Sequence, residues 1–228
     1  MNSRNVTPQK AVEEGETPAF GRNSKSRNED DAEQDKADLE YPILWSEGYF
    51  EAKYELGEEI DNASRATVTK CVRISDGATF VVKKYRYKFI QDYRENVLNH
   101  FHWVQKLNKN GCKKVVEMVD LYKDDEAGHF LQVNVWYPEA EKLSDFIKAE
   151  KVFFEVKAAD FTKQVLDSAA SFRSCGMVHR GLSAQAYLCF EKDGRRDIFL
   201  NEFYCATKDE PIMKEVAGVP LYIAPECY

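Results

Sequence analysis

The sequence predicts an α+β fold of two lobes, in which a small lobe of antiparallel strands comes before a helical lobe. Two patterns support this prediction. Between residues 54 and 136, five stretches alternate apolar and polar residues as strands do, and one stretch between them has apolar residues at helical spacing. After residue 142, apolar residues recur every three or four positions, which is typical of amphipathic helices.

Composition divides the chain into three parts. Residues 1 to about 40 contain one aromatic residue, Phe20, and end in an acidic run, so they cannot bury enough apolar surface to offset the entropy of ordering. We therefore expect a disordered acidic tail at 1–45, followed by a strand-rich part at 46–136 and a helix-rich part at 137–228, which the family resemblance given below implies are a small lobe and a partial large lobe.

The expected elements follow in order along the chain. A hairpin turn is expected at residues 75–78, and a connector at residues 137–139 joins the strand-rich part to the helix-rich part. The expected strands are 54–57, 67–74, 79–85, 115–122 and 129–136, and the expected helices are 88–107, 143–149 and 153–173.

Charge and composition exclude several classes of function. The net charge is −7 and the isoelectric point is about 5.3, which leaves no basic footprint for nucleic acid. The first ten residues lack the apolar core of a signal peptide, and no run of about 18 apolar residues could span a bilayer, so we expect a cytoplasmic protein, with the nucleus left open. The six cysteines form no CxxC pair, and we expect reduced thiols.

The most informative motif is the stretch at residues 177–188, which reads MVHRGLSAQAYL. It resembles the HRDLKPEN catalytic loop of the protein kinase family, with Gly181, Ser183 and Ala186 where the family has Asp, Lys and Asn. In that family the Asp accepts the substrate proton, the Lys steadies the transferred phosphate and the Asn binds a magnesium ion. The resemblance therefore implies a pseudokinase with no intact catalytic residue.

The same resemblance places the nucleotide-binding positions in the small lobe. Lys83 matches the phosphate-binding lysine, while Val68, Val81 and Leu188 match positions around the nucleotide. Asp61, Ala63 and Ala66 stand where the family's three loop glycines would be, unless the loop is longer and Gly57 is the first of them. We expect a loop unsuited to ATP, because glycines let backbone N–H groups approach the phosphates.

This chain also differs from the family at the helix glutamate and at the metal-binding triplet. The glutamate position falls on His100, with Glu95 as an alternative if the helix is shifted, and the DFG triplet is matched by Glu202, Phe203 and Tyr204. Glu202 is thus the one candidate metal ligand. Residues 217–226 match the family's GTPxYxAPE segment.

The losses are selective. The positions that resemble the family's internal hydrophobic spine, Val104, Met118, His179 and Phe203, keep apolar or aromatic character. The sequence stops two residues after Glu226, so we expect an incomplete helical large lobe and an exposed apolar face on the helix at 153–173. A natural truncation, a splice form and a gene-model fragment stay open.

The resemblance covers roughly residues 49–228, and the stretch 189–198 is similar to that of calmodulin-dependent and giant muscle kinases. We expect a catalytically impaired protein-kinase-like domain that binds a protein partner as a scaffold or regulator. No cofactor is expected, although ATP and Mg²⁺ would bind if the nucleotide site were retained. A weak or atypical Ser/Thr kinase that uses Lys83 and Glu202, and a non-functional truncated fragment, remain the alternatives.

Overall fold

The computed structural model describes residues 43–62, 66–150, 152, 154–210, 216–218 and 220–225. The expected acidic tail lies almost entirely outside the described residues, as do Ala63, Glu226 and Cys227. Residues 43–228, within which all described residues fall, belong to one compact unit. The chain already packs on the small lobe ahead of the expected boundary at 46, since the ring of Trp45 stacks on Phe130 at 5.4 Å.

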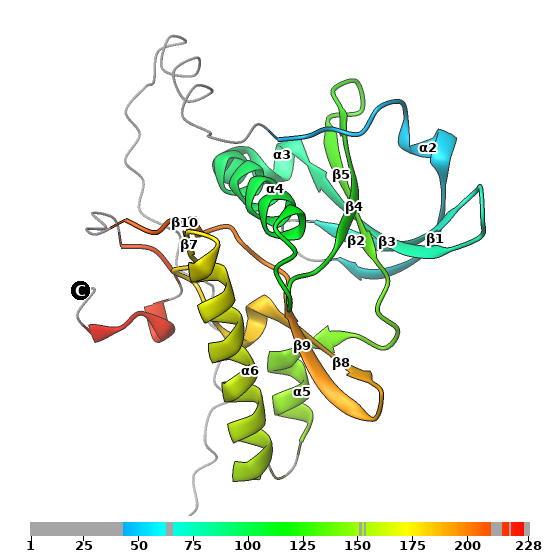
Figure 1. Cartoon of the computed structure of the whole chain (residues 1–228). Coiled ribbons are helices and arrows are strands. Elements are labelled where there is room, and N and C mark those ends of the chain that lie inside the picture. The colour runs from blue at the N-terminus through cyan, green and yellow to red at the C-terminus, as the bar shows by residue number, and fades with distance from the viewer. Residues whose placement is uncertain are drawn as a thin grey trace, which may run out of the picture. The chain divides into compact units, whose positions relative to one another are not determined.

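Five antiparallel strands form the sheet of the small lobe (Figure 1). The strands run in the order β1-β2-β3-β5-β4, so the first three are sequential neighbours and β5 inserts between β3 and β4. Their bounds are β1 Tyr54–Asn62, β2 Thr67–Arg73, β3 Thr79–Arg86, β4 Met118–Asp124 and β5 His129–Val135. The predicted fold class is confirmed, and a short helix that we did not expect, α2 (Phe50–Lys53), precedes β1.

The fourth strand begins later than predicted. Val115 forms an isolated parallel bridge with Leu200 of the large lobe, and the Val116 N–H donates to the Leu200 carbonyl at 3.0 Å. These residues are therefore held by the other lobe, and pairing with β5 starts only at Met118. The alternation of apolar and polar residues at 115–122 is the same whether a residue pairs with β5 or with Leu200, so the sequence pattern could not predict this difference.

The small-lobe helix is shorter at its start than predicted. Helix α4 covers Arg94–Lys109, and the residues before it form the short helix α3 (Tyr87–Ile90) and the 3₁₀ turn η1 (Gln91–Tyr93). Tyr93 has a ψ of 12°, which interrupts the α-helical course. Phe89, which fitted the apolar spacing, is 53% exposed as a result.

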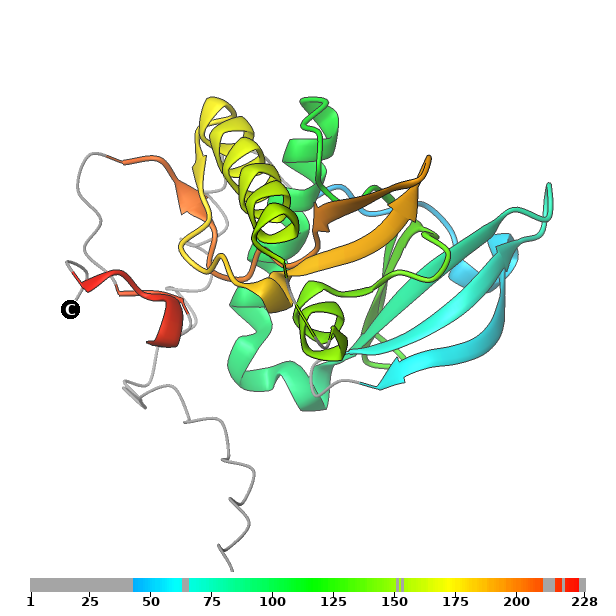
Figure 2. The ribbon, with the colours of Figure 1, turned by 90° about the horizontal axis from the view of Figure 1, so that it is seen from below.

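The described residues of the large lobe form two α-helices and two small sheets. Helix α5 (Leu143–Ala149) matches its prediction, and α6 (Glu155–Ser174) lies close to its predicted range. Phe146 and Phe161 join the two helices with an edge-to-face contact at 5.7 Å. One sheet has the order β6-β8-β9 (Glu141–Lys142, Tyr187–Lys192, Arg195–Leu200), and the other pairs β10 with β7 (Thr207–Lys208, Met177–Val178). The lobe also has two 3₁₀ turns among its described residues, η2 (Ala184–Ala186) and η3 (Pro220–Tyr222). Figure 2 shows these elements from below.

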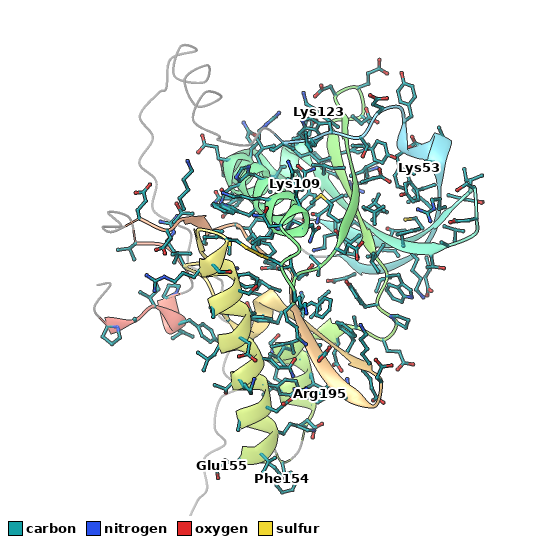
Figure 3. The ribbon with its side chains drawn as sticks, viewed as in Figure 1. Lys53, Lys109, Lys123, Phe154, Glu155 and Arg195 are labelled. Atoms are coloured by element: carbon teal, nitrogen blue, oxygen red, sulfur yellow. A yellow bond between two sulfur atoms is a disulfide. The ribbon has the colours of Figure 1, made fainter. Side chains whose placement is uncertain are left out.

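Apolar side chains are exposed on α6 and just before it. Phe154 is 68% exposed and projects at the start of the helix (Figure 3), and Val156 and Leu166 are also largely exposed. The inward side of α6 instead buries Phe161 and Phe172. This exposure agrees with the expected apolar face.

One pair departs from the expectation of six separate reduced thiols. The structure brings the sulfur atoms of Cys112, three residues after α4, and Cys175, directly after α6, within reach of a disulfide bond. The two residues are 63 positions apart, so only the docking of the two helices brings them together. Among the described residues Cys71, Cys189 and Cys205 remain free.

No helix among the described residues has both the length and the apolar character needed to cross a membrane.

Candidate functional site

Lys83 lies on β3 and points into the interior between the sheet and the large lobe. Its side chain is only 8% exposed, and its Nζ donates a hydrogen bond of 2.6 Å to Oδ1 of Asn201. Asn201 is itself buried and directly follows β9. The lysine expected to hold a phosphate is therefore bound to a neutral side chain that the sequence did not single out.

The surroundings of Lys83 disfavour its charged form. Burial lowers the pKa of Lys83 to about 8, and the positive charge of Lys142 lowers it further, while the carboxylates of Glu202 and Asp61 act in the opposite direction. Glu202 is thus close enough to affect the lysine, but its side chain is half-buried and Asn201 makes the hydrogen bond. Among the residues that the structure describes, no carboxylate pairs directly with Lys83, whereas an active kinase has such a partner at this position.

His100 occupies the helix position where the family has its glutamate. It is completely buried on α4, and burial together with the charge of Lys83 lowers the pKa of His100 to about 3, so the ring is neutral. Its Nε2 lies 2.9 Å from Oε1 of Gln132, and its Nδ1 accepts a hydrogen bond of 3.2 Å from the N–H of Phe203. Both bonds are satisfied by the tautomer with the proton on Nε2. The alternative residue, Glu95, is exposed in the first turn of α4.

A chain of buried polar groups continues from His100 along β5. The Gln132 amide donates to Oδ1 of Asn134 at 2.9 Å, and the Tyr85 hydroxyl donates to Oε1 of Gln132 at 3.2 Å. Among the described residues every fully buried side-chain nitrogen or oxygen atom has a partner. The sequence did contain a signal for this network, since Gln132 and Asn134 are polar residues at alternate positions of an otherwise apolar strand.

The internal spine of the two lobes is packed as expected. Val104 and Phe203 are fully buried in one core cluster, against which Met118 packs. His179 lies beside Phe203 with ring centroids 5.6 Å apart, and its Nε2 lies 2.6 Å from the carbonyl oxygen of Glu202. Burial lowers the pKa of His179 to about 4, so this ring is also neutral and donates that hydrogen bond.

The three altered catalytic-loop positions lack the carboxylate, ammonium and carboxamide groups that the family has there. Gly181 has no side chain, Ser183 is buried at the start of the 3₁₀ turn η2, and Ala186 is buried within that turn. A Cβ atom added to Gly181 would come no closer than 3.4 Å to Cys205, and the backbone there is not in the left-handed region. Backbone geometry therefore does not require the glycine.

Gly218, unlike Gly181, stands where the backbone and the packing do require a glycine. Gly218 has a φ of +117°, and a Cβ atom built there would lie 2.3 Å from the carbonyl oxygen of Arg180. Arg180 has a φ of 59° and donates from Nε to the Cys205 carbonyl at 2.9 Å. This close approach fixes the segment around Gly218 beside the catalytic-loop positions.

The loop expected to cover a nucleotide carries an ion pair instead of glycines. Asp61 lies at the end of β1, where Nζ of Lys142 approaches its carboxylate to 3.7 Å from the start of the large lobe. Both side chains are more than one third exposed, so the pair adds little stability. Gly57 lies within β1 and contacts Lys70 of β2, which removes it as a loop glycine, and Ala66 packs against the core.

The three apolar positions expected around a nucleotide are all half-buried. Val68 pairs with Lys83 across β2 and β3, Val81 pairs with Asn134, and Leu188 pairs with Lys142 on β8. Two cavities, of about 510 and 460 Å³, lie in the small lobe, and none of these three residues lines either of them. The three positions thus keep the apolar character of a nucleotide slot.

The residues present fit magnesium and ATP poorly. In the family, Mg²⁺ is held by the DFG carboxylate and the catalytic-loop asparagine, and Ala186 offers no donor atom at the second position. Glu202 is the remaining carboxylate, and a single half-buried glutamate offers Mg²⁺ one of the two protein ligands that the family provides.

Comparison with known proteins places this architecture among the kinases. The chain is 26% identical over 176 residues to a calcium/calmodulin-dependent protein kinase type 1 from Caenorhabditis elegans, covering 76% of this chain and 49% of the relative. It is 26% identical over 177 residues to calcium-dependent protein kinase 7 from Oryza sativa subsp. japonica, covering 76% of this chain and 32% of the relative.

A third relative is the CaM kinase-like vesicle-associated protein of Xenopus laevis, at 22% identity over 193 residues, which covers 84% of this chain and 48% of that protein. The chain thus spans about half or less of the length of these relatives. The family model for the protein kinase domain matches residues 54–228. The chain therefore belongs to the protein kinase domain family.

Proposed function

We propose that this chain is a catalytically impaired kinase domain that works by binding another protein, as a scaffold or regulatory module. The observation that carries the proposal is the 2.6 Å hydrogen bond between Lys83 and Asn201. An active kinase uses this lysine on the nucleotide phosphates and holds it with a helix glutamate. Here the ammonium group is already bonded inside the protein, and the helix position is a neutral histidine.

The catalytic loop supports the same conclusion. General-base help is typically worth about 10²–10⁴-fold in rate, and Gly181 cannot provide it. Ser183 is not a cation, and Ala186 is not a metal ligand, so the electrostatic stabilisation of the transferred phosphate is lost as well. The spine and the polar network remain packed, which suits a domain retained for its shape.

The direct test is phosphate transfer from γ-labelled ATP to generic Ser/Thr substrates with Mg²⁺ or Mn²⁺. We expect no transfer above that of the Lys83→Met variant. Transfer that is clear in the natural chain and absent from Lys83→Met would show that the lysine works on a nucleotide and would refute the proposal.

Restoring the catalytic loop provides a sharper second test. The double variant Gly181→Asp/Ala186→Asn returns the base and the second metal ligand of the family. We expect this variant to stay inactive, because Lys83 and Asn201 remain bonded and His100 remains uncharged. Recovery of activity in this variant would place the whole impairment in the catalytic loop.

A second candidate function is a weak or atypical nucleotide-dependent kinase that uses Lys83 and Glu202. It is favoured by the electrostatic influence of the Glu202 carboxylate on Lys83. On that reading ATP with Mg²⁺ should raise the melting temperature through binding linkage, by an amount that grows with the logarithm of ligand concentration. Absence of any shift at millimolar ATP and Mg²⁺ would eliminate this candidate.

A further inference from the structure

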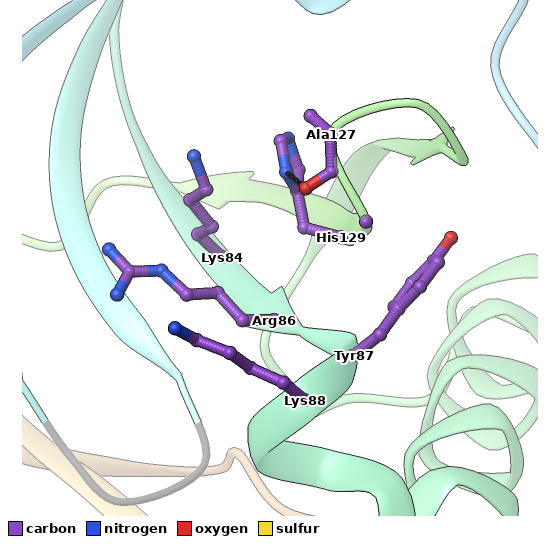
Figure 4. Close-up of a pocket in the computed structure, with 7 residues that line it drawn as sticks. Lys84, Arg86, Tyr87, Lys88, Ala127 and His129 are labelled. Atoms are coloured by element: carbon purple, nitrogen blue, oxygen red, sulfur yellow. Dashed lines mark hydrogen bonds between the residues drawn. The ribbon is translucent and has the colours of Figure 1, made fainter.

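A basic cavity lies on the outer side of the small lobe, away from Lys83 and the catalytic-loop positions. Its volume is about 510 Å³, and it is lined by Lys84, Arg86, Tyr87, Lys88, Ala127, Gly128 and His129. Figure 4 shows the side chains of Lys84, Arg86 and Lys88 extending in the same direction from the end of β3 and the start of α3. None of the lining residues is acidic.

The three cations are brought together by strand geometry. Lys84 and Arg86 are two positions apart on β3 and therefore point to the same face of the sheet, opposite to the face of Lys83. Lys88 follows in the first turn of α3. The opposite wall comes from β5, because His129 pairs with Arg86 across the sheet.

These positive charges lack an anionic partner within the described part of the chain. No described carboxylate comes within 4.0 Å of Lys84, Arg86 or Lys88, although the side chains of Arg86 and Lys88 lie over the ring of Phe89. Three like charges at one cavity repel each other, and a bound anion would relieve that repulsion. Two acids lie at the edge of the cavity: Asp125 accepts a hydrogen bond of 3.1 Å from the Tyr87 hydroxyl and pairs with Lys123, and Asp124 lies 3.7 Å from His129.

His129, on the wall of the cavity that β5 forms, is the one lining residue whose ordinary pKa lies near neutral pH. Its Nδ1 lies 3.3 Å from the Ala127 carbonyl, and its Nε2 lies 3.7 Å from the Asp124 carboxylate. Burial and the charge of Lys84 lower the pKa of His129, against the opposing effect of Asp124 and Glu51. Its single N–H is on Nδ1 and is accepted by the Ala127 carbonyl, so the neutral imidazole lines the cavity without adding a fourth positive charge.

We propose that this cavity is a binding site for a phosphomonoester carried by a partner protein, that is, for a phosphoserine or phosphothreonine side chain. Its dianion would bring charge and acceptor oxygens to the two ammonium groups and the guanidinium. A protein ligand suits the site better than an anionic membrane does. The adjacent turn exposes Asp125 and Glu126, which would repel a flat negative surface but leave a single phosphate free to enter.

The test compares a phosphoserine peptide with its unphosphorylated form by fluorescence anisotropy on the full chain at low salt. We expect the phosphopeptide alone to bind, with affinity that falls as salt rises. The double variant Lys84→Gln/Arg86→Gln should weaken binding at least about tenfold, because two charge-assisted contacts are lost. The control Lys148→Gln/Lys192→Gln removes the same charge from exposed positions on the large lobe and should bind as the natural chain does.

Several outcomes would overturn the proposal. Equal affinity of both double variants would mean that the attraction is not located in the cavity. Equal binding of phosphorylated and unphosphorylated peptide, or no binding at millimolar phosphopeptide, would exclude a phosphate site. Binding to vesicles that contain phosphoinositide, without binding to the phosphopeptide, would assign the cavity to a membrane. Matching melting temperatures of the variants confirm that each is folded.

Discussion

Burial of Lys83 on β3 predicts how the free energy of unfolding depends on pH. Lys83 has a pKa of about 8 in the folded chain, whereas an exposed lysine titrates near about 10.4. Between these two values the unfolded chain binds more protons than the folded chain, so the contribution of Lys83 to stability must rise as pH rises from 8 to about 10.5. Below pH 8 both states carry the charge, and the cost of burying it is present in full.

The magnitude follows from the two pKa values. Linkage gives a cost of about 3 kcal/mol for the buried charge at pH 7 and of about 1.4 kcal/mol at pH 9.5. Lys83→Met has a side chain of similar shape and no titration. The difference in unfolding free energy between the natural chain and Lys83→Met should therefore move in favour of the natural chain by about 2 kcal/mol between pH 7 and pH 9.5.

The assay is urea denaturation of both proteins at each pH, extrapolated to zero denaturant. Other groups also titrate in this range, since burial raises the pKa of Tyr87, Tyr122 and Tyr187 to about 12, but their effects cancel in the difference between the two proteins. The matched control is Lys84→Met, which removes a lysine from the opposite face of the same strand. A difference for Lys83→Met that does not change with pH would refute the assignment of Lys83 as a desolvated ammonium.

Three further predictions concern the packing around the site. Phe203→Ala should lower the free energy of unfolding by about 3–5 kcal/mol in urea denaturation, because the Phe203 ring is fully buried. The control Phe89→Ala, at an exposed ring, should cost far less. Similar losses in both variants would contradict the placement of Phe203 in the core. Gly218→Ala should lower stability by about 1–3 kcal/mol, because its Cβ atom would collide with the Arg180 carbonyl, and a variant as stable as the natural chain would exclude that close approach. His100 has a pKa lowered to about 3, so its protonation in the unfolded chain should cost about 2 kcal/mol of stability between pH 7 and pH 5; His100→Gln should lose that part of the acid sensitivity, and an unchanged pH dependence would argue against a neutral buried ring.

The spacing of residues was enough to predict most elements. Helix α5 was predicted at its observed bounds, and the five strands of the small lobe were all found in order. Errors occurred where another part of the chain competes for a segment. Val115 pairs with Leu200 rather than extending β4, and Phe89 points outward because the helix is interrupted before α4.

The candidate site was predicted as a list of substitutions and not as a set of contacts. The positions of Lys83, His100 and Glu202 followed from motif spacing, but the bond from Lys83 to Asn201 crosses 118 positions of sequence. Asn201 carried no signal of its own, because an asparagine beside a degenerate metal triplet is an ordinary residue in sequence. Gln132 and Asn134 could have been found as polar interruptions of an apolar strand.

By itself the sequence determined the family, and it showed that the family's catalytic carboxylate and metal-binding asparagine are absent from the catalytic loop. Side-chain identity decides whether a proton acceptor or a metal ligand is present, and no fold can supply what Gly181 and Ala186 lack. Tertiary structure decided what took their place. Partner choice among buried polar groups depends on distances set by packing two lobes together, which is why the lysine meets an amide, the histidine meets a glutamine, and three lysine and arginine side chains share one outer cavity.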